Sequence, residues 1–521
     1  MAARSSGQPE VVIGCDIGSH GVKVVLLSLA GEYLGEAGAA YGIHYPKPTW
    51  AEQAAQTWLE AMPIALTALR AATGFAPRQV RALGLAAQVD GVVAVDAVGR
   101  PLRPAIIWMD RRAAPQCQVA ARGADPASLF KLSGLNLDAT HVAPKIRWLA
   151  ENEPDIYAAS AYFLLPGSYV AYSLTGELAV DYANASSTLL MDVTQRAWSS
   201  ALCRLFDVPA ERLAPLRPAT DLLGGLRPAA AEALGLLPGT PVTVGTGDEH
   251  AGCAGAGVVR PGLVCDIAGT AEPVCASATE PAFDPSGLVE THCHADPALW
   301  LLENPGFVSG ANYRWFRDEF APLEVQAAAQ AGGSAYDLLN EAAARVPPGA
   351  DGLVLLPCLM GAMTPTWNSA ARGTFAGFTL AHKREHFARA LLEASAYGVR
   401  DIVDQMRRMG LPLEEIRVVG GGSRSRLWRQ IKADVTGLPV TLPQTAETSA
   451  LGAAMLALVG IGEFASLSEA ARRVVRVVET VEPNRALQAC YEDGYQLYRD
   501  TYFALLPVFE RAARRGAGRT A

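Results

Sequence analysis

Carboxylates that follow apolar strands are the residues of this chain best suited to chemistry. Asp248 comes directly after the apolar run 242–247 and opens an Ala/Gly-rich stretch with the pattern of a helix. At a helix N-terminus the dipole stabilises its negative charge, and the carboxylate can accept a proton from a substrate hydroxyl. Asp248 could equally cap the helix, a role that is compatible with catalysis. Spacing alone leaves both roles open.

A second acid stands at the entrance of a glycine-containing turn. Residues 16–21 read DIGSHG between the β-branched runs 11–17 and 22–27, which predicts a hairpin. The N–H groups of such a turn can surround a phosphate, and Asp16 could hold Mg²⁺ through water. In isolation the same motif is typical of an ordinary hairpin in which the Asp makes a local turn bond.

A similar strand-turn-strand pattern returns ~250 residues later, at 262–276, with Gly269 and Thr270 in its turn. A triphosphate held between two halves of a chain needs hydrogen-bond donors from both halves. The second turn therefore favours phosphate binding at both sites.

A third glycine site, GGG at 420–422, links the β-branched run 416–419 to a helical pattern over 427–436. Glycines at a strand's carboxyl end let a nucleotide approach without side-chain clash. The motif is neither GxGxxG nor GxxxxGK(S/T), which disfavours the Rossmann and P-loop interpretations. We expect nucleotide contact here, against the alternative of a simple tight turn.

The elements between these motifs alternate between strand-like and helix-like patterns, which predicts an α/β architecture. Two related halves, each opening with a glycine-containing hairpin, are expected to pack around a cleft. Helical patterns cover 53–71, 144–150, 229–234, 386–406, 448–459 and 486–509, and strand patterns cover 80–85, 92–96, 242–245 and 351–357.

Composition excludes several classes of function. Half of the 521 residues are hydrophobic, the net charge is −8, and no Lys/Arg run resembles a nucleic-acid footprint. The first ten residues are polar, and the longest apolar run, 450–462, is shorter than the ~20 residues of a membrane span. We expect the basic residues near the end to cap a helix or to lie in solvent: Arg511, Arg514, Arg515 and Arg519.

The cysteines and histidines give no strong metal signature. Nine cysteines are scattered without a CxxC pair, which favours a reducing cytoplasm. His292 and His294 could share one face of a strand, but no second ligand cluster follows them. The sequence therefore disfavours a metal site there.

Taken in order, these motifs resemble the FGGY carbohydrate kinases, most nearly the xylulokinase-like branch, from about residue 11 to about residue 507. Single motifs of this kind are common, whereas their order along one chain is specific. They are DIGS at 16–19, PTWAEQ at 48–53, GLAAQ at 84–88, LRPAIIWMDR at 102–111, APKIRWL at 143–149, GD at 247–248, GT at 269–270, TP at 364–365, GTFAGF at 373–378, LLE at 391–393 and GGGSRS at 420–425.

The resemblance implies an actin-like (ribonuclease H-like) α/β ATPase fold with two duplicated domains around a central cleft. Residues 10–255 would form the sugar-binding N-terminal domain with the catalytic Asp, and residues 256–480 the ATP-binding C-terminal domain. Residues 481–521 would form a helix that packs back on the body and a short tail. It also implies ATP and Mg²⁺, a xylulose-like ketopentose or related sugar or polyol as acceptor, no nucleic-acid or membrane partner, and is compatible with a homodimer.

The resemblance also assigns roles to individual residues. Asp248 falls on the family's catalytic Asp, and Asp16 on the acid near Mg²⁺ and the phosphates. The expected ATP contacts are Asp16, Gly18, Ser19, His20, Lys23, Gly269, Thr270, Gly421, Gly422 and Ser423. The expected sugar contacts are Gln88, Val89, Asp90, Trp108, Asp110, Arg111, Asp248 and Glu249.

Several positions depart from the xylulokinase pattern. Met-His is usual where this chain has Val89 and Asp90, Asn is usual at Glu249, and Thr-Ser is usual at Ser19 and His20. These changes put D-xylulose itself in question while leaving a keto-sugar or polyol acceptor in place. Two alternatives remain: a catalytically weak sugar-sensing paralogue, and an actin-like ATPase that is not a sugar kinase.

Overall fold

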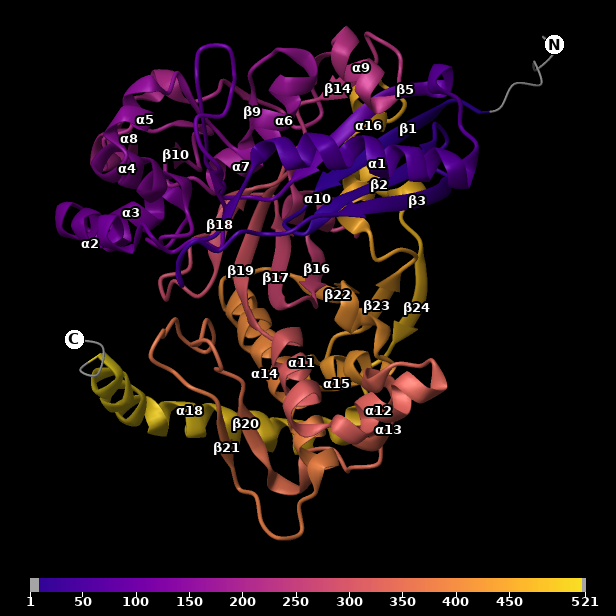
Figure 1. The fold of residues 1–521 in the computed structure, drawn as a ribbon. Coiled ribbons are helices and arrows are strands. Elements are labelled where there is room, and N and C mark those ends of the chain that lie inside the picture. Colours follow the sequence, from indigo (N-terminus) through magenta and orange to yellow (C-terminus); the bar gives the residue numbers. More distant parts are fainter. Residues whose placement is uncertain (1–8, 518–521) are drawn as a thin grey trace.

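The computed structural model describes residues 9–517, and its architecture is built on two seven-stranded sheets. The earlier half of the chain surrounds the first sheet, in the upper part of Figure 1, and the later half surrounds the second sheet below it. The first sheet has the order β13–β14–β5–β1–β2–β3, with β15 also paired to β5. Its strands are β1 (Val11–Ile17), β2 (Gly21–Ser28), β3 (Tyr33–Ala40), β5 (Val80–Ala87), β13 (Leu222–Gly225), β14 (Pro241–Thr243) and β15 (Thr246–Gly247).

The expected first hairpin is confirmed. β1 and β2 pair antiparallel in a register that sets Asp16 opposite Lys23, and β1 runs parallel to β5. Both central strands are almost continuously buried, as the apolar β-branched sequence of a strand covered on both faces requires. The carboxyl ends of β1 and β5 therefore meet at one edge of the sheet.

One face of the first sheet is covered by α1 (Ala55–Thr73), whose buried residues recur at helical spacing from Trp58 to Leu69. The helix ends at Gly74, which adopts a left-handed conformation that few other residues tolerate. It packs on β2 and β3. The helix α1 therefore holds the hairpin of β1 and β2 in place from one face of the sheet.

The other face of the first sheet is covered by α16 (Thr448–Gly460), a helix from the far end of the sequence. It packs on β1, β5 and α10 (Asp248–Gly255), and Figure 1 shows its late-chain colour inside the upper half. A Cβ at Gly14 would lie 2.0 Å from the carbonyl oxygen of Ala450, and one at Gly84 would lie 1.8 Å from that of Ala453. Glycine at these positions lets the helix lie directly against the strands. The sequence predicts this helix but not its position against the first sheet.

The second sheet repeats the arrangement of the first at its centre. Its order is β18–β19–β17–β16–β22–β23–β24, with β16 antiparallel to β17 and parallel to β22. The expected second hairpin is thereby confirmed. The strands are β16 (Gly262–Ile267), β17 (Ala271–Ala278), β18 (Glu290–Cys293), β19 (Trp300–Val308), β22 (Leu413–Val419), β23 (Val440–Pro443) and β24 (Val477–Val481).

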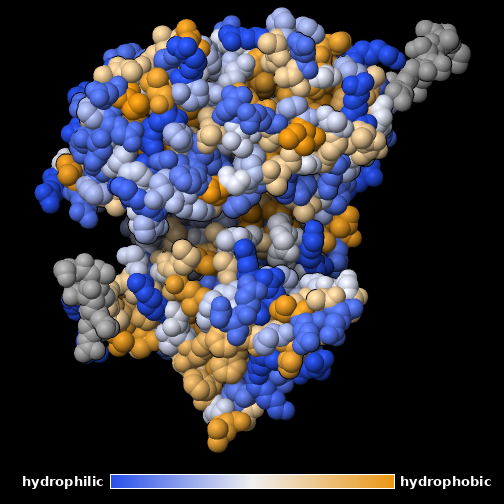
Figure 2. All heavy atoms as spheres, in the orientation of Figure 1, coloured by the Kyte–Doolittle hydropathy of each residue, from blue (hydrophilic) through white to orange (hydrophobic). Residues whose placement is uncertain are grey.

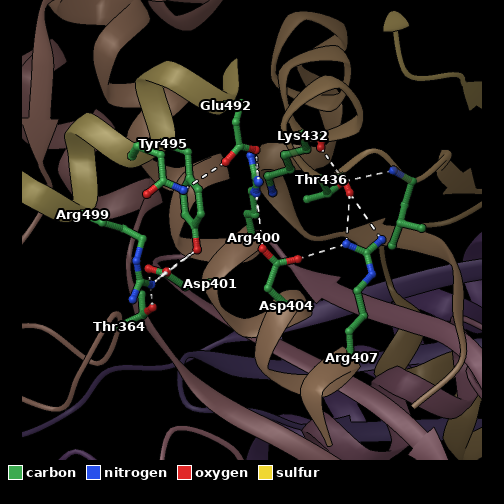
Figure 3. Close-up of polar contacts among 12 residues, drawn as sticks. Thr364, Arg400, Asp401, Asp404, Arg407, Lys432, Thr436, Glu492, Tyr495 and Arg499 are labelled. Carbon is green, nitrogen blue, oxygen red and sulfur yellow. Dashed lines mark hydrogen bonds and ion pairs between the residues drawn. The ribbon is translucent and has the colours of Figure 1, made fainter. Parts of the chain in front are cut away.

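The later half is bound together by α14 (Arg384–Arg408) and the terminal helix α18 (Gln488–Ala517). Figure 3 shows how polar side chains join these two helices. Asp401 on α14 is fully buried and accepts hydrogen bonds from the Tyr495 hydroxyl at 2.6 Å and the Thr364 hydroxyl at 3.0 Å, and Arg499 pairs with it. Arg400, one residue earlier, forms an ion pair with Glu492. These contacts join α18 to α14.

The strand expected at 351–357 is shorter and lies elsewhere. Asp351 adopts a positive φ of 53° in a short turn, so the strand begins only at β20 (Val354–Leu356). β20 pairs with β21 (Thr374–Ala376) in a separate two-stranded sheet. The apolar sequence was recognised correctly, whereas the turn before it was not.

The remaining helices cover the two sheets and extend the first half. Within residues 9–517 no helix is long and apolar enough to cross a bilayer. Arg519 and the tail from residue 518 onward lie outside the described residues, as do residues 1–8. The other elements are β4 (Glu52–Gln53), β6 (Val93–Val95), β7 (Ala105–Ile106), α2 (Ala114–Gly123), α3 (Pro126–Ser133), α4 (Val142–Asn152), α5 (Pro154–Ala159), β8 (Tyr162–Leu164), α6 (Pro166–Thr175), β9 (Val180–Asp181), α7 (Tyr182–Ser186), β10 (Met191–Asp192), β11 (Ala197–Trp198), α8 (Ser200–Phe206), β12 (Leu216–Arg217), α9 (Pro228–Leu234), α11 (Gly310–Phe320), α12 (Pro322–Ala331), α13 (Ala335–Ala344), α15 (Arg426–Thr436) and α17 (Leu467–Val474).

Candidate active site

Asp16 ends β1 beside the glycine turn that leads into β2. The amide of Gly18 donates to the carbonyl of Gly21 at 3.0 Å and closes the turn. One carboxylate oxygen of Asp16, Oδ1, is buried and has no hydrogen-bond partner among the described residues. Burial, and then the charge of Asp248, raises the pKa of Asp16 well above its ordinary value. A buried carboxylate oxygen without a partner is suited to a cation that arrives with a ligand.

Two side chains position the rest of this first hairpin. The indole Nε1 of Trp108 donates to the Ser19 hydroxyl at 2.8 Å, and the Gln53 amide donates to the Ser19 carbonyl at 2.8 Å. His20 is exposed at the tip of the turn. Lys23, opposite Asp16, forms an ion pair with Glu447 immediately before α16. The hairpin is therefore tied to the 108 loop on one side and to the later half on the other.

Asp248 is the first residue of α10, as its position after an apolar run predicted. The strand β15 pairs with the end of β5 and delivers Asp248 to the sheet edge where β1 also ends. The Asp248 carboxylate accepts the backbone N–H of Glu249 at 2.9 Å, but Gly247 occupies the N-cap position and no side chain caps the helix, so the expected capping by Asp248 is not found. Burial raises the pKa of Asp248 to about 6, and the backbone N–H groups oppose that shift.

Gly245 and Gly247 allow this approach. Gly245 has a φ of 79°, and a Cβ there would lie 2.5 Å from the carbonyl oxygen of Leu85. A Cβ at Gly247 would lie 2.5 Å from the side chain of Val89. The small residues before Asp248 are therefore required for β15 and the 88–90 loop to meet.

The 88–90 loop lies beside the Asp248 turn. Gln88 is buried and donates to the Gln53 side chain at 2.8 Å. Asp90 adopts a positive φ of 57°, is also buried, and its Oδ1 has no hydrogen-bond partner in the described chain. The imidazole Nδ1 of His141 lies 3.4 Å from the other oxygen of Asp90. An unpartnered acid at this position is able to accept hydrogen bonds from a ligand.

The side chains of the 108–111 loop differ in whether they reach the candidate site. Trp108 is half-buried and reaches the first hairpin. Asp110 is fully buried, and its carboxylate accepts the Ala51 amide at 2.6 Å and the Arg112 guanidinium at 2.7 Å. Arg111 is paired with Asp138 near the surface. The carboxylate of Asp110 is thus committed to holding the loop, which leaves it no free oxygen for the sugar contact expected from the sequence.

The second hairpin carries Gly269 and Thr270 between β16 and β17. The start of α11 lies directly against it, with the Gly310 amide donating to the Gly269 carbonyl at 3.1 Å. Arg314 on α11 donates to the Thr270 hydroxyl at 3.1 Å. Beneath the turn, buried Lys432 forms ion pairs with carboxylates from both strands, Asp266 at 2.5 Å and Glu272.

The GGG motif packs against that hairpin. Gly420 has a φ of 81°, and the Gly422 amide donates to the Ala268 carbonyl at 2.8 Å. Around Gly421 an added Cβ would meet nothing within 4 Å, so the turn has an open side. The hydroxyl of Ser423 is buried and donates to the carbonyl of Gly420 at 2.7 Å. The structure therefore places this motif next to the second hairpin.

Three buried polar residues of the later half, Cys275, His292 and Glu303, lie close to Glu249 or to one another next to the Asp248 turn, and the sequence analysis assigned none of them to the sugar site. Ligand atoms of Glu249, Cys275 and Glu303 all lie within 4.8 Å of one another. His292 Nε2 lies 3.6 Å from Glu303. The signal was present, because Glu303 interrupts the apolar strand β19, where an unpaired acid would be costly. Figure 2 shows that the surface is narrowed and recessed between the upper and lower halves of the molecule.

Comparison with protein families decides what this arrangement belongs to. Residues 11–255 match the N-terminal domain of the FGGY family of carbohydrate kinases, and residues 266–461 match the C-terminal domain of that family. The chain belongs to the FGGY family of carbohydrate kinases. It is a sugar kinase, a phosphotransferase that uses an alcohol group as acceptor.

Individual relatives of this FGGY kinase differ in the substrate that their names give. The xylulose kinase of Escherichia coli (strain K12) is 31% identical over 497 residues, 95% of this chain and 99% of the relative. The autoinducer-2 kinase of the same strain is 33% identical over 510 residues, 94% of each chain. The crystal structure of xylulose kinase from Rhodospirillum rubrum matches with a TM-score of 0.88 and 30% identity, covering 96% of this chain and 100% of that one. These matches confirm the expected two-domain fold.

Proposed function

We propose that this FGGY kinase transfers the γ-phosphoryl group of ATP to a hydroxyl of a ketopentose or a related sugar or polyol. The observation that carries the proposal is the meeting of Asp248 and Asp16 at one end of the sheet, where the charge of Asp248 adds to burial in raising the pKa of Asp16. Asp248 is proposed as the general base and the two hairpins as the phosphate-binding turns. The xylulose kinase relatives support a keto-sugar acceptor.

In the proposed reaction the ionised carboxylate of Asp248 accepts the proton of the attacking hydroxyl. A pKa of about 6 leaves the group mostly ionised near neutral pH while keeping it basic enough to accept a proton. Phosphoryl transfer depends mainly on positioning and on stabilising charge at the phosphate oxygens. The amides of Gly18 and Gly269 close their own turns, so other backbone N–H groups of the two turns are proposed to supply hydrogen bonds to those oxygens.

The donor set at Asp16 fits a hydrated magnesium ion. Its Oδ1 is buried without a partner, and Mg²⁺ prefers oxygen ligands and retains much of its water. When bound, Mg²⁺ would neutralise phosphate charge during transfer. The residues that we propose to hold the adenosine side of ATP are Gly421 and Gly422, next to the open side of their turn.

Exclusion of water from this site would favour the sugar hydroxyl over hydrolysis of ATP. The proposed location is the cytoplasm, because all nine cysteines are free and eight of them are buried. A homodimer, as the family resemblance allows, remains part of the proposal.

The test is a coupled ADP-release screen over ketopentoses, ketohexoses and four- to six-carbon polyols. We expect at least one acceptor to raise ADP release far above the sugar-free rate. Asp248→Asn should then lower kcat by about 10²- to 10⁴-fold, the usual contribution of a general base, while ATP affinity changes little. The exposed Glu414→Gln variant is the matched control.

Other results would favour the alternatives. Acceptor binding without ADP release would support a sugar-sensing paralogue. ADP release that no acceptor increases would support an ATPase that is not a sugar kinase. Wild-type turnover by Asp248→Asn would remove this residue from the catalytic role.

A further inference from the structure

A cluster of four carboxyl groups lies beside Asp248: Asp90, Glu249, Glu290 and Glu303. Two come from the earlier half of the chain and two from strands β18 and β19 of the later half. Glu249 accepts a hydrogen bond from the Cys275 thiol at 3.2 Å. Glu290 accepts the Asn136 amide at 2.7 Å. The cluster therefore bridges the two halves at the base of the proposed acceptor site.

His292 lies in the middle of this cluster without a hydrogen bond. Its side chain is 5% exposed, and neither ring nitrogen has a partner. Its Nε2 lies 3.6 Å from a carboxylate oxygen of Glu303 and 3.9 Å from one of Glu290, both too long for a hydrogen bond. Burial, together with the neighbouring imidazoles of His250 and His141, lowers the pKa of His292 well below its ordinary value, so the ring is neutral. A buried imidazole and the free Oδ1 of Asp90 thus face a site that a polar ligand can complete.

The cations near the cluster are already engaged. Lys145 donates to the backbone carbonyls of Asp90, at 2.6 Å, and Thr140. His141 stands beside the carboxylate of Asp90. Arg111 is paired with Asp138. Burial opposes protonation of His141, but the charge of Asp90 outweighs it and raises the His141 pKa to about 9, so the imidazolium charge is paired with Asp90. The positive charges near the cluster are thus directed at protein groups, and burial raises the pKa values of the cluster's carboxyl groups Glu249, Glu290 and Glu303.

We propose that this cluster is the specificity-determining wall of the acceptor site and that it selects an uncharged polyhydroxylated substrate while rejecting aldonates. The inference rests on the proposed function, because it places the acceptor beside Asp248. Hydroxyl groups can donate to carboxylates or accept from protonated carboxyls, so a polyol satisfies the wall. A substrate carboxylate would add a further negative charge beside the ionised Asp248, inside a buried cluster of carboxyl groups whose neighbouring cations are already paired.

The test compares two five-carbon ligands that differ at one terminus, xylitol and D-xylonate. Binding to the full-length enzyme is measured calorimetrically without ATP, so the result does not require turnover. We expect xylitol to bind at least ~100-fold more tightly than D-xylonate, because like-charge contacts across a buried site are strongly unfavourable. In Glu303→Gln the ratio should fall to about tenfold or less as the wall loses an ionisable group.

Two further variants provide a second test of the cluster and a control. Glu249→Gln should reduce the ratio in the same direction, and the exposed Glu414→Gln should leave it unchanged. Equal binding of the two ligands to the wild type, binding of neither, or an unchanged ratio in both cluster variants would overturn the inference. A stoichiometric divalent cation in the purified protein that is lost in Cys275→Ser would also overturn it, because Glu249, Cys275 and Glu303 would then be metal ligands.

If no sugar increases ADP release but xylitol still binds more tightly than D-xylonate, the proposed kinase reaction is wrong while the proposed role of the carboxyl cluster is supported. If aldonates bind and are phosphorylated, the proposed kinase reaction is supported while the proposed selection by the carboxyl cluster is wrong. The two failures are therefore distinguishable.

Discussion

Asp16 and Asp266 occupy equivalent positions at the ends of β1 and β16, each in the triplet Cys-Asp-Ile, yet only Asp266 forms an ion pair. Oδ1 of both carboxylates is buried without a hydrogen-bond partner, but Oδ2 of Asp266 is paired with Lys432 below the second hairpin, whereas no ion pair forms at Asp16 among the described residues. The two copies of one hairpin have thus diverged in charge balance. One carboxylate is neutralised by the protein, and the other remains available.

The first prediction concerns pH. Because the ionised carboxylate of Asp248 is the active form and its pKa is raised to about 6, kcat/KM for the acceptor should fall as pH drops through about 6. We expect about a tenfold loss per pH unit below that value and a plateau from about pH 7 upward. Initial rates between pH 5 and 8 measure it, with circular dichroism to show that the protein stays folded. An acid limb that is absent, or that Asp248→Asn retains, would contradict the assignment.

The second prediction concerns the hydrogen bond between Trp108 and Ser19. Trp108→Phe and Ser19→Ala each remove it, and should raise the KM for ATP by a few-fold, in line with the ~1 kcal/mol of a typical hydrogen bond. Because both changes remove the same contact, the double variant should be little worse than either single one. A double-mutant cycle on KM tests this. Fully additive effects would show that the contact does not position the turn.

The third prediction concerns Lys432. Lys432→Met leaves Asp266 and Glu272 buried without their cation and should destabilise the protein by about 3–5 kcal/mol. The triple variant with Asp266→Asn and Glu272→Gln should recover much of that loss, because no uncompensated charge remains. Urea unfolding of the three proteins measures the difference. Equal stability of the single and triple variants would be inconsistent with a charge effect.

The fourth prediction concerns the contact between α16 and α10. A Cβ at Gly452 would lie 1.9 Å from the carbonyl oxygen of Ala251, so Gly452→Ala should cost at least ~2 kcal/mol despite the better helix propensity of Ala. The matched control is Gly333→Ala, where an added Cβ meets nothing within 4 Å. Thermal unfolding compares the two. A control variant as unstable as Gly452→Ala would remove the steric explanation.

The sequence was sufficient to predict the hairpins and the placement of Asp248, because both depend on local patterns. Runs of β-branched residues ending at glycine specify strand and turn within a few residues, and Asp248 follows such a run directly. The helices expected at 386–406 and 448–459 were found within two residues at each end.

What the sequence could not give depends on contacts between distant segments. Glu303 and His292 reach the proposed acceptor site only because β18 and β19 lie at the end of the second sheet that meets the first half. The hydrogen bonds between Asp110 and Arg112 likewise depend on packing, because a motif shows which residues are present but not how their side chains are oriented.

The position of α16 has a consequence for how the chain acquires its structure. During synthesis the earlier half emerges first, but residues 448–460 supply much of the layer that covers one face of its central sheet. That half must therefore wait, with apolar strand surface uncovered, until most of the polypeptide has left the ribosome. A fragment ending at residue 255 would carry the same defect permanently, so cutting this protein between its halves should give an aggregation-prone piece rather than a working module.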